Sequence, residues 1–137
     1  MLPAATNMGA GMLMGMPDTL YDLTTFCSTG VQVPVPGPNT AMHTPGSPTS
    51  MKVVIGTGQP LVISTMITAT ISPGSGTLVG LVSQVSCMQA VFCMGSSKVM
   101  LDGQPGIYLG CMATQNLANC VSGAQAVPSQ SKVLISP

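Results

Sequence analysis

All three lysines of this 137-residue chain occupy the same place in a repeated strand pattern. The three copies read MKVVI (51–55), SKVML (97–101) and SKVLI (131–135), and the chain contains no arginine. The copies are unequally spaced, whereas a solenoid of identical units would be regular. We therefore predict three arms of one closed object, related by an approximate three-fold axis.

The first two copies continue into a common turn. GTGQPLVIS (56–64) follows the first copy and DGQPGIYLG (102–110) follows the second. A glycine-containing turn between two apolar runs predicts a β-hairpin. A lysine at the start of each strand keeps an exposed edge hydrated. Each arm is therefore expected to be a short strand–turn–strand unit.

The composition favours a compact all-β fold. Charged residues make up only 4% of the chain, whereas about 25% is usual in soluble domains. Apolar residues reach 45%, which argues against wholesale disorder. Gly, Ser and Gln interrupt the longest apolar runs before one could span a membrane as a helix. The stretches between the many Gly and Pro residues are rich in Val, Ile and Thr. Because only 3% of the residues are aromatic, the core is expected to consist of small aliphatic side chains and methionine.

Charge also limits the partners of the chain. The net charge is zero, and there is no basic patch that would bind nucleic acid. The N-terminal region carries no lysine or arginine, so a secretory signal is not expected. A surface so poor in charge is prone to association, and we expect much of it to be covered by a protein partner.

The chain is expected to divide into two parts. Residues 1–26 are rich in Met and Gly and predict an N-terminal arm, either flexible, packed on the body or docked to a partner. Residues 27–137 form the main domain. Within it, Pro34, Pro36 and Pro38 exclude a central strand. This proline-rich segment is either a rigid surface linker or an edge segment that wraps the body.

The repeat resembles that of the PAAR and PAAR-like spike-tip proteins, whose hallmark is a strand–turn–strand of the form GSPxVxIxGxPAAxxGD. GSSKVMLDGQPGIYLG (95–110) follows this pattern closely, and PSQSKVLI (128–135) matches its first half. MKVVIGTGQPLVIS (51–64) is a degenerate copy, and VPVPGPN (33–39) looks like the proline-rich segment of the PAAR-like branch. The resemblance covers residues 27–135. The alanines, arginine and aspartate after the family's turn are replaced here by GIYLGC.

The resemblance implies a small cone of β-hairpins with pseudo-three-fold symmetry. Its broad base would sit on the blunt end of a trimeric VgrG-like spike, one chain per trimer. Such tips belong to type VI secretion systems, extracellular contractile injection systems and phage tails. The chain would assemble in the bacterial cytoplasm and leave with the spike, contacting a target membrane transiently. Effector proteins are further expected partners.

Two other functions stay open. In the first, the chain is a cargo adaptor that tethers effectors to the spike through residues 1–26. In the second, it is a structural capsid or tail protein without a role at the tip, which would associate with itself.

The resemblance also implies a metal at the tip, held in the family mostly by histidine with one cysteine. This chain has a single histidine. His43, Cys87 and Cys120 each stand at a similar distance before a repeat lysine, so they are the first candidates to hold Zn (or Fe) at the apex. Cys93 and Cys111 come next. Alternatively the cysteines are small buried side chains, or Cys111 and Cys120 form a disulfide.

An enzyme is not expected. The only acids are Asp18, Asp22 and Asp102, and Asp102 lies in a turn signal where aspartate is favoured locally. Paired-carboxylate catalysis is therefore hard to build. A cysteine nucleophile paired with His43 is conceivable, but no spacing supports it. The glycine-rich segments do not open helices, so they do not indicate a phosphate-binding loop.

Overall fold

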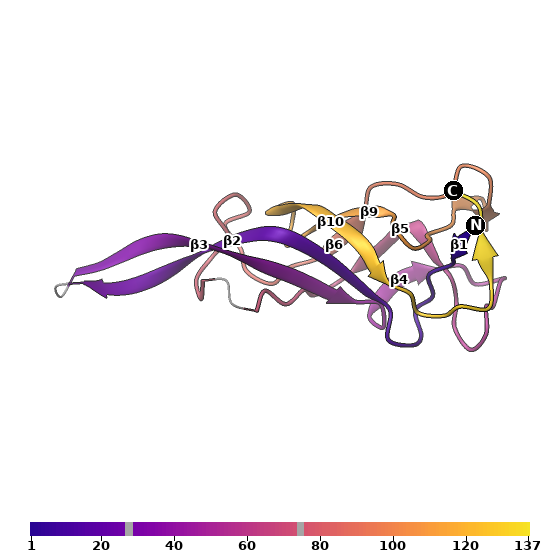
Figure 1. Cartoon of the computed structure of the whole chain (residues 1–137), viewed down its shortest axis with the longest axis horizontal. Helices are drawn as coiled ribbons and strands as arrows, with labels where there is room; N and C mark the ends of the chain where they lie inside the picture. The colour runs from indigo at the N-terminus through magenta and orange to yellow at the C-terminus, as the bar shows by residue number, and fades with distance from the viewer. Residues whose placement is uncertain (27–28, 74–75) are drawn as a thin grey trace.

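In the computed structural model the chain is a tapered all-β molecule with a broad and a narrow end (Figure 1). The structure describes residues 1–26, 29–73 and 76–137. This part of the chain contains no helix that is long and apolar enough to cross a membrane. The strands are Leu2–Pro3 (β1), Met12–Phe26 (β2), Thr29–Met42 (β3), Gly46–Thr49 (β4), Leu61–Ile67 (β5), Ala90–Phe92 (β6), Met100–Leu101 (β7), Gln104–Pro105 (β8), Met112–Gln115 (β9), Cys120–Val127 (β10) and Leu134–Ile135 (β11).

One antiparallel sheet of seven strands runs along the molecule, in the order β3-β2-β10-β9-β6-β5-β4. Strands β2 and β3 form a long hairpin that extends from the body as the narrow end (Figure 1). Pro34, Pro36 and Pro38, which were expected to exclude a central strand, lie in β3, the edge strand of this sheet. An edge strand tolerates proline because its outer side has no ladder to pair with. The edge alternative for this segment is therefore confirmed.

The three lysine-containing segments form three short hairpins at the broad end. In arm 1 (residues 50–60) a bridge joins Ile55 and Gly58. In arm 2 (residues 96–106) β7 pairs with β8. Arm 3 is made from both ends of the chain: β11 pairs with β1, and both termini lie at the broad end (Figure 1). Arm 3 is thus defined as residues 130–137 together with 1–4.

A closed cycle of three backbone hydrogen bonds ties the arms together. The N–H of Ala5 donates to the carbonyl of Ile107 at 2.8 Å, that of Ile107 to Leu61 at 3.0 Å, and that of Leu61 to Ala5 at 2.9 Å. All three residues are buried. The flanking bridges repeat in the same sense: Ala4 with Tyr108, Val62 with Gly106, and Thr6 with Pro60. The predicted conical all-β fold with pseudo-three-fold symmetry is confirmed.

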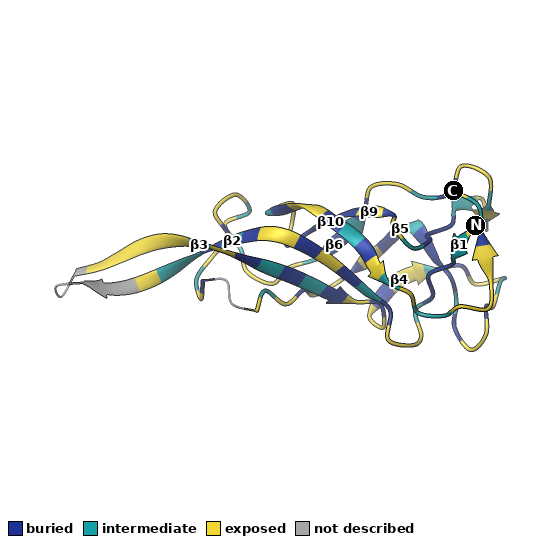
Figure 2. Ribbon diagram, in the orientation of Figure 1, coloured by how far each residue is buried: buried dark blue, intermediate teal, exposed yellow. Residues whose placement is uncertain are grey.

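The apolar core fills the broad end between the arms. Each arm contributes one aliphatic side chain from its first strand, and Ile55, Leu101 and Ile135 are 8%, 7% and 6% exposed. Figure 2 shows the buried residues gathered in the body, while much of the narrow hairpin is exposed. The largest fully buried apolar residues that complete the core come from the long strands and from the turn after arm 2: Leu13, Leu20, Leu61, Ile67 and Ile107.

The prediction of a methionine-filled core is wrong. Among the described residues the buried apolar set contains no methionine, and eleven of the twelve methionines are exposed. Strand alternation explains this, because neighbouring side chains point to opposite faces. Leu13 and Ala113 point inward, whereas Met14 and Met112 point outward. The exposed methionines of the seven-stranded sheet are Met14, Met16, Met42, Met66 and Met112, and the others lie in β7 or outside the strands.

The first 26 residues are built into the body. Strand β2 pairs with β3 on one side and with β10 on the other. Leu13 and Leu20 are 0% and 2% exposed, and Ala5 belongs to the three-fold cycle. The sheet therefore includes residues on both sides of the division expected after residue 26.

A buried carboxylate holds the narrow part of the body together. Asp18 is fully buried on β2 and accepts hydrogen bonds from side chains of separate segments. Asn39 of β3 donates at 2.7 Å, and Asn116 donates to both carboxylate oxygens at 3.3 Å. Ser72 and Asn119 donate to it as well. These neutral donors come from separate segments and satisfy the buried carboxyl group, which would otherwise cost free energy.

Replacing Asp18 by alanine should destabilise the fold strongly. The substitution removes the acceptor that Asn39, Asn116 and Asn119 share, so we expect a loss of roughly 2–4 kcal/mol of unfolding free energy. Urea denaturation measures this. Asp22→Ala on the same strand is the matched control, because the Asp22 carboxylate is solvated and accepts from Thr77 and Leu23 only near the surface. Equal losses in the two variants would contradict the structural role of Asp18.

Candidate functional site

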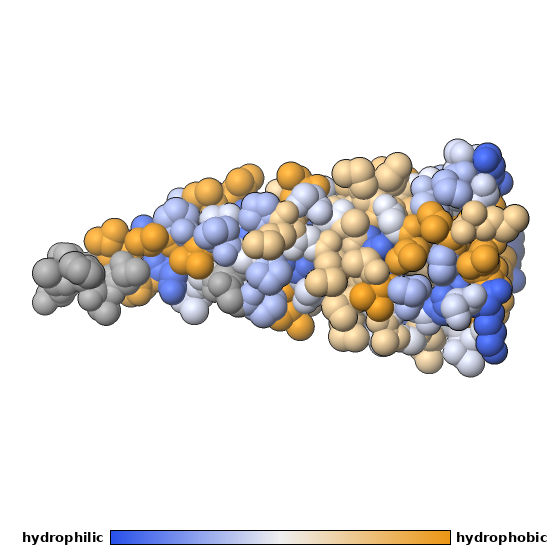
Figure 3. Space-filling model, viewed as in Figure 1, coloured by the Kyte–Doolittle hydropathy of each residue, from blue (hydrophilic) through white to orange (hydrophobic). Residues whose placement is uncertain are grey.

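The broad end presents a three-fold surface of lysines and apolar side chains. Lys52, Lys98 and Lys132 each begin an arm and are exposed. Two residues further, each arm turns an apolar side chain outward: Val54, Met100 and Leu134 are 65%, 54% and 47% exposed. Strongly hydrophilic residues gather at the rim of this end (Figure 3). The base therefore combines a positive rim with exposed aliphatic and thioether groups.

The backbone at the start of each arm is held by a side-chain acceptor. In arm 2 the hydroxyl of Ser96 accepts from the N–H of Lys98 at 3.2 Å and of Val99 at 2.9 Å. In arm 3 the amide oxygen of Gln130 accepts from the N–H of Lys132 and of Val133, both at 2.8 Å. These acceptors stand two residues before their lysines and fix the direction in which each arm leaves the body.

Arm 1 receives its acceptor from arm 2. The carboxylate of Asp102 accepts from the Ser50 hydroxyl at 2.8 Å, and from the N–H of Met51 and of Lys52 at 2.8 and 3.2 Å. The hydrogen bond from Ser50, followed by that from the Lys52 backbone, lowers the pKa of the Asp102 carboxyl. Asp102 thus bridges two arms as an ionised group.

His43 lies deep in the body just after β3, away from any other predicted ligand. Its Nε2 is 2.5 Å from the Gln125 amide oxygen, and its Nδ1 is 3.2 Å from the Thr6 carbonyl oxygen. Gly11 fits closely against the ring, where a Cβ would come within 2.2 Å of Nδ1. His43 therefore joins the N-terminal segment to β10, and both ring nitrogens already face protein oxygens.

The structure does not assemble the other expected ligands around His43. Cys87 and Cys93 are exposed on the outside of the body, whereas Cys111 and Cys120 are fully buried. Cys111 accepts from the Tyr108 N–H at 3.3 Å. Burial raises the pKa of both buried thiols, which keeps them protonated. Cys27, the remaining cysteine of the sequence, lies outside the described residues.

These residues do not fit a metal centre. Within residues 1–26, 29–73 and 76–137, no three His, Cys, Asp or Glu side chains lie together as a ligand set. Cys111 and Cys120 are free thiols, so the structure contains no disulfide between them. We build no function on a bound metal.

The sequence patterns missed the second half of arm 3. Strand β1 and the residues after it supply this half, with Pro3 beside Leu134 and Ala5 in the three-fold cycle. The signal was present, since Pro3, Ala4 and Ala5 match the PAA of the family's repeat. It stands at the opposite end of the chain from its partner strand, which hides the pairing from any local pattern.

A comparison with protein families supplies the assignment. The family model described as "Toxin PAAR-like domain" matches residues 11–122. The chain belongs to this PAAR-like family. No curated protein and no solved structure matches the chain. The match omits both ends of the PAAR-like chain, which are the segments that make arm 3.

The stability of this PAAR-like protein should fall in mild acid because of His43. Burial, the largest effect, lowers the pKa of His43 from its ordinary 6.5 despite its contacts with Gln125 and Thr6. Below about pH 6.5 the unfolded chain therefore binds more protons than the folded one. Stability is fully present above this pH and is lost as the pH falls toward the lower folded value.

Urea denaturation at about pH 7.5 and about pH 5 checks this dependence. His43→Gln should flatten it, whatever its effect on stability at neutral pH. As the only histidine, His43 also gives an unambiguous ring signal in NMR. A ring that titrates above its ordinary pKa would contradict the prediction.

Proposed function

We propose that this PAAR-like chain caps a trimeric, VgrG-like spike of a bacterial contractile injection machine, with its broad base against the spike. The supporting observation is the closed three-fold cycle of Ala5, Leu61 and Ile107. A single chain that repeats one contact three times about an axis matches a three-fold partner. One chain would then cap three spike subunits.

The chemistry of the base suits stable binding to a spike. Each arm offers an exposed apolar side chain next to a lysine. Burial of the apolar groups contributes about 25 cal/mol for each Å² removed from water, and the lysines add charge complementarity to an acidic partner. The exposed methionines adapt their shape to a partner surface.

The shape of the narrow end suits the part of a spike that enters the target membrane first. The β2–β3 hairpin extends away from the base (Figure 1), and the Asp18 hydrogen bonds fix its root to the β9–β10 turn. A rigid root transmits axial force from the spike into the hairpin. The chain would be assembled in the cytoplasm, leave the cell with the spike and aid both membrane puncture and delivery of effectors. The proposal needs neither catalysis nor a metal.

The cargo-adaptor alternative is not favoured by the structure. It needs residues 1–26 as a tether, yet Leu13 and Leu20 are buried and β1 completes arm 3. Deleting residues 1–26 would remove part of the fold. Such a deletion therefore cannot separate cargo delivery from assembly.

Changes to the base should weaken spike binding without unfolding the chain. We expect the double variant Val54→Ser, Met100→Ser to bind a trimeric spike at least about tenfold more weakly. Val121→Ser, Met16→Ser is the matched control on the tapering side, because Val121 and Met16 are 66% and 63% exposed. Binding is measured by calorimetry, and the ratio of one chain to three subunits by native mass spectrometry. Equal affinities of the two variants would show that the base is not the docking surface.

A further inference from the structure

The three junctions between neighbouring arms differ in one position. Directly after the buried aliphatic residue of its first strand, each arm carries a turn residue that faces the preceding arm. Arm 2 has Asp102 here, and its carboxylate holds Ser50, Met51 and Lys52 of arm 1. This junction is closed by a charged acceptor.

The junction between arms 2 and 3 is closed in the same sense. Ser136 occupies the equivalent position in arm 3. Its carbonyl accepts from the Ser96 hydroxyl at 2.5 Å, and its hydroxyl lies 3.4 Å from Lys98 Nζ. The residue that faces the preceding arm again supplies acceptor oxygens, and the preceding arm supplies donors.

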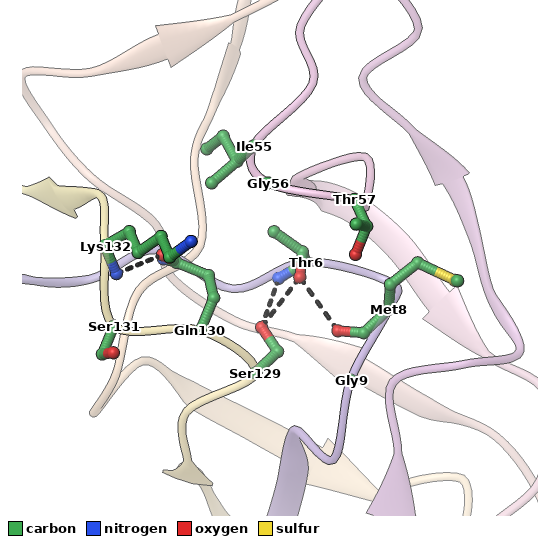
Figure 4. A pocket seen from close by; sticks show the side chains of 10 residues that line it. All are labelled: Thr6, Met8, Gly9, Ile55, Gly56, Thr57, Ser129, Gln130, Ser131 and Lys132. Carbon is green, nitrogen blue, oxygen red and sulfur yellow. Dashed lines mark hydrogen bonds between the residues drawn. The ribbon is translucent and has the colours of Figure 1, made fainter.

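The junction between arms 3 and 1 lacks such a side chain, because the equivalent residue of arm 1 is Gly56. A Cβ placed at Gly56 would meet no atom within 4 Å. A cavity of about 270 Å³ lies here instead, between the turn of arm 1 and the start of arm 3 (Figure 4). The third junction is therefore open where the other two are filled.

The walls of this cavity are rich in donors. Lys132 and the hydroxyl residues Thr6, Thr57, Ser129 and Ser131 line it, and no acid from the described part of the chain does. In Figure 4 the Thr57 hydroxyl points into the cavity from the side opposite Lys132. The hydroxyls of Thr6 and Ser129 already bond to each other at 3.0 Å. Among the described residues of this lining, Lys132, Thr57 and Ser131 remain as side-chain donors for a ligand.

We propose that this cavity receives a carboxylate side chain of the docked partner. This carboxylate would accept hydrogen bonds between arms 3 and 1, as the Asp102 carboxylate does between arms 1 and 2. The inference rests on the proposed function and names the chemistry of the partner at one point of the base. A lysine ammonium flanked by hydroxyls is a site for a carboxylate, whose charge-assisted hydrogen bonds are the stronger kind. The base carries three exposed lysines against the single acid Asp102, so an acidic partner is favoured.

The same asymmetry limits how many partner carboxylates the base can bury. A symmetric trimer offers three equivalent carboxylates, and only one junction of this chain has room for one. One chain would therefore bury a single carboxylate of the trimer at this site, whichever of the three subunits supplies it.

Gly56→Asp tests the inference directly. Gly56 has a φ of +65°, and Asp102 already adopts a φ of +51° at the equivalent place, so aspartate fits this backbone. The new carboxylate should fill the cavity and bond to arm 3. Gly103→Asp is the matched control: Gly103 has a φ of +78° and equally open surroundings, but it lies in the turn of arm 2, away from the cavity.

The first measurement uses the chain alone and acetate as the probe, at constant ionic strength with chloride as the reference anion. Backbone amides at Thr57 and at residues 129–132 should show saturable NMR shifts in the wild type and in Gly103→Asp. Gly56→Asp should abolish the shifts, and Lys132→Gln should weaken acetate binding by about tenfold. Shifts that do not saturate, or that persist unchanged in Gly56→Asp, overturn the carboxylate site.

The second measurement uses the trimeric spike. Gly56→Asp should reduce spike affinity about tenfold or more, because two carboxylates then compete for one cavity, while Gly103→Asp should bind nearly as the wild type does. Saturable acetate binding with unchanged spike affinity in Gly56→Asp would overturn the partner side chain as the source and point to a free carboxylate. A wild-type chain that binds acetate but no spike would refute the proposed function instead.

Discussion

The backbone hydrogen bonds that link Ala5, Leu61 and Ile107 in a cycle are the constraint from which the rest of the base follows. Each bond fixes the position of one arm relative to the next, so the three buried aliphatic residues of the first strands hold equivalent places in their arms. The side chains that point the other way then emerge together on the base. Because the three backbone contacts are equivalent, the positions after the buried aliphatic residues can be compared directly, and Gly56 of arm 1 is the one without a side chain.

The two halves of the molecule are stabilised by different physics. The broad end has an apolar core of short aliphatic side chains, whose burial is non-directional. Toward the narrow end the interior is polar, with Asp18, Asn39 and Asn116 all fully buried. Hydrogen bonds among buried polar groups are directional and strengthen one another. This suits a hairpin root that has too little cross-section for a large apolar core.

The β9–β10 turn shows the cost of this arrangement. Asn116, Leu117 and Ala118 have φ values of +50°, +52° and +65°, a left-handed conformation that costs each residue roughly 1 kcal/mol or more. Asn116 and Asn119, at the two ends of this turn, both donate to Asp18. The hydrogen bonds to the carboxylate thus offset local backbone strain.

The sequence predicted the three arms correctly, but it did not predict the β1 half of arm 3, the outward position of the methionines or the separation of the candidate metal ligands. The aligned lysines and the Asp102–Gly103 turn are local signals, and they predicted the hairpins and their symmetry correctly. The role of residues 1–5 was missed because β1 pairs with β11 at the far end of the chain. The methionines were assigned to the core because hydrophobicity alone does not say which face of a strand is covered. The metal hypothesis relied on sequence distance from the lysines, whereas the fold places His43 inside and Cys87 outside.

The pairing of β1 with β11 has a consequence for synthesis of the protein. Leu2 and Pro3 are translated before their partners Ile135 and Leu134, and all strands of the seven-stranded sheet lie between them in the sequence. The base therefore cannot close before residues 134 and 135 have left the ribosome, and a chain interrupted before residue 134 lacks one of the three arms. Prematurely terminated products would be excluded from any assembly that recognises all three arms of the base. The pairing of β1 with β11 therefore excludes chains that lack the third arm.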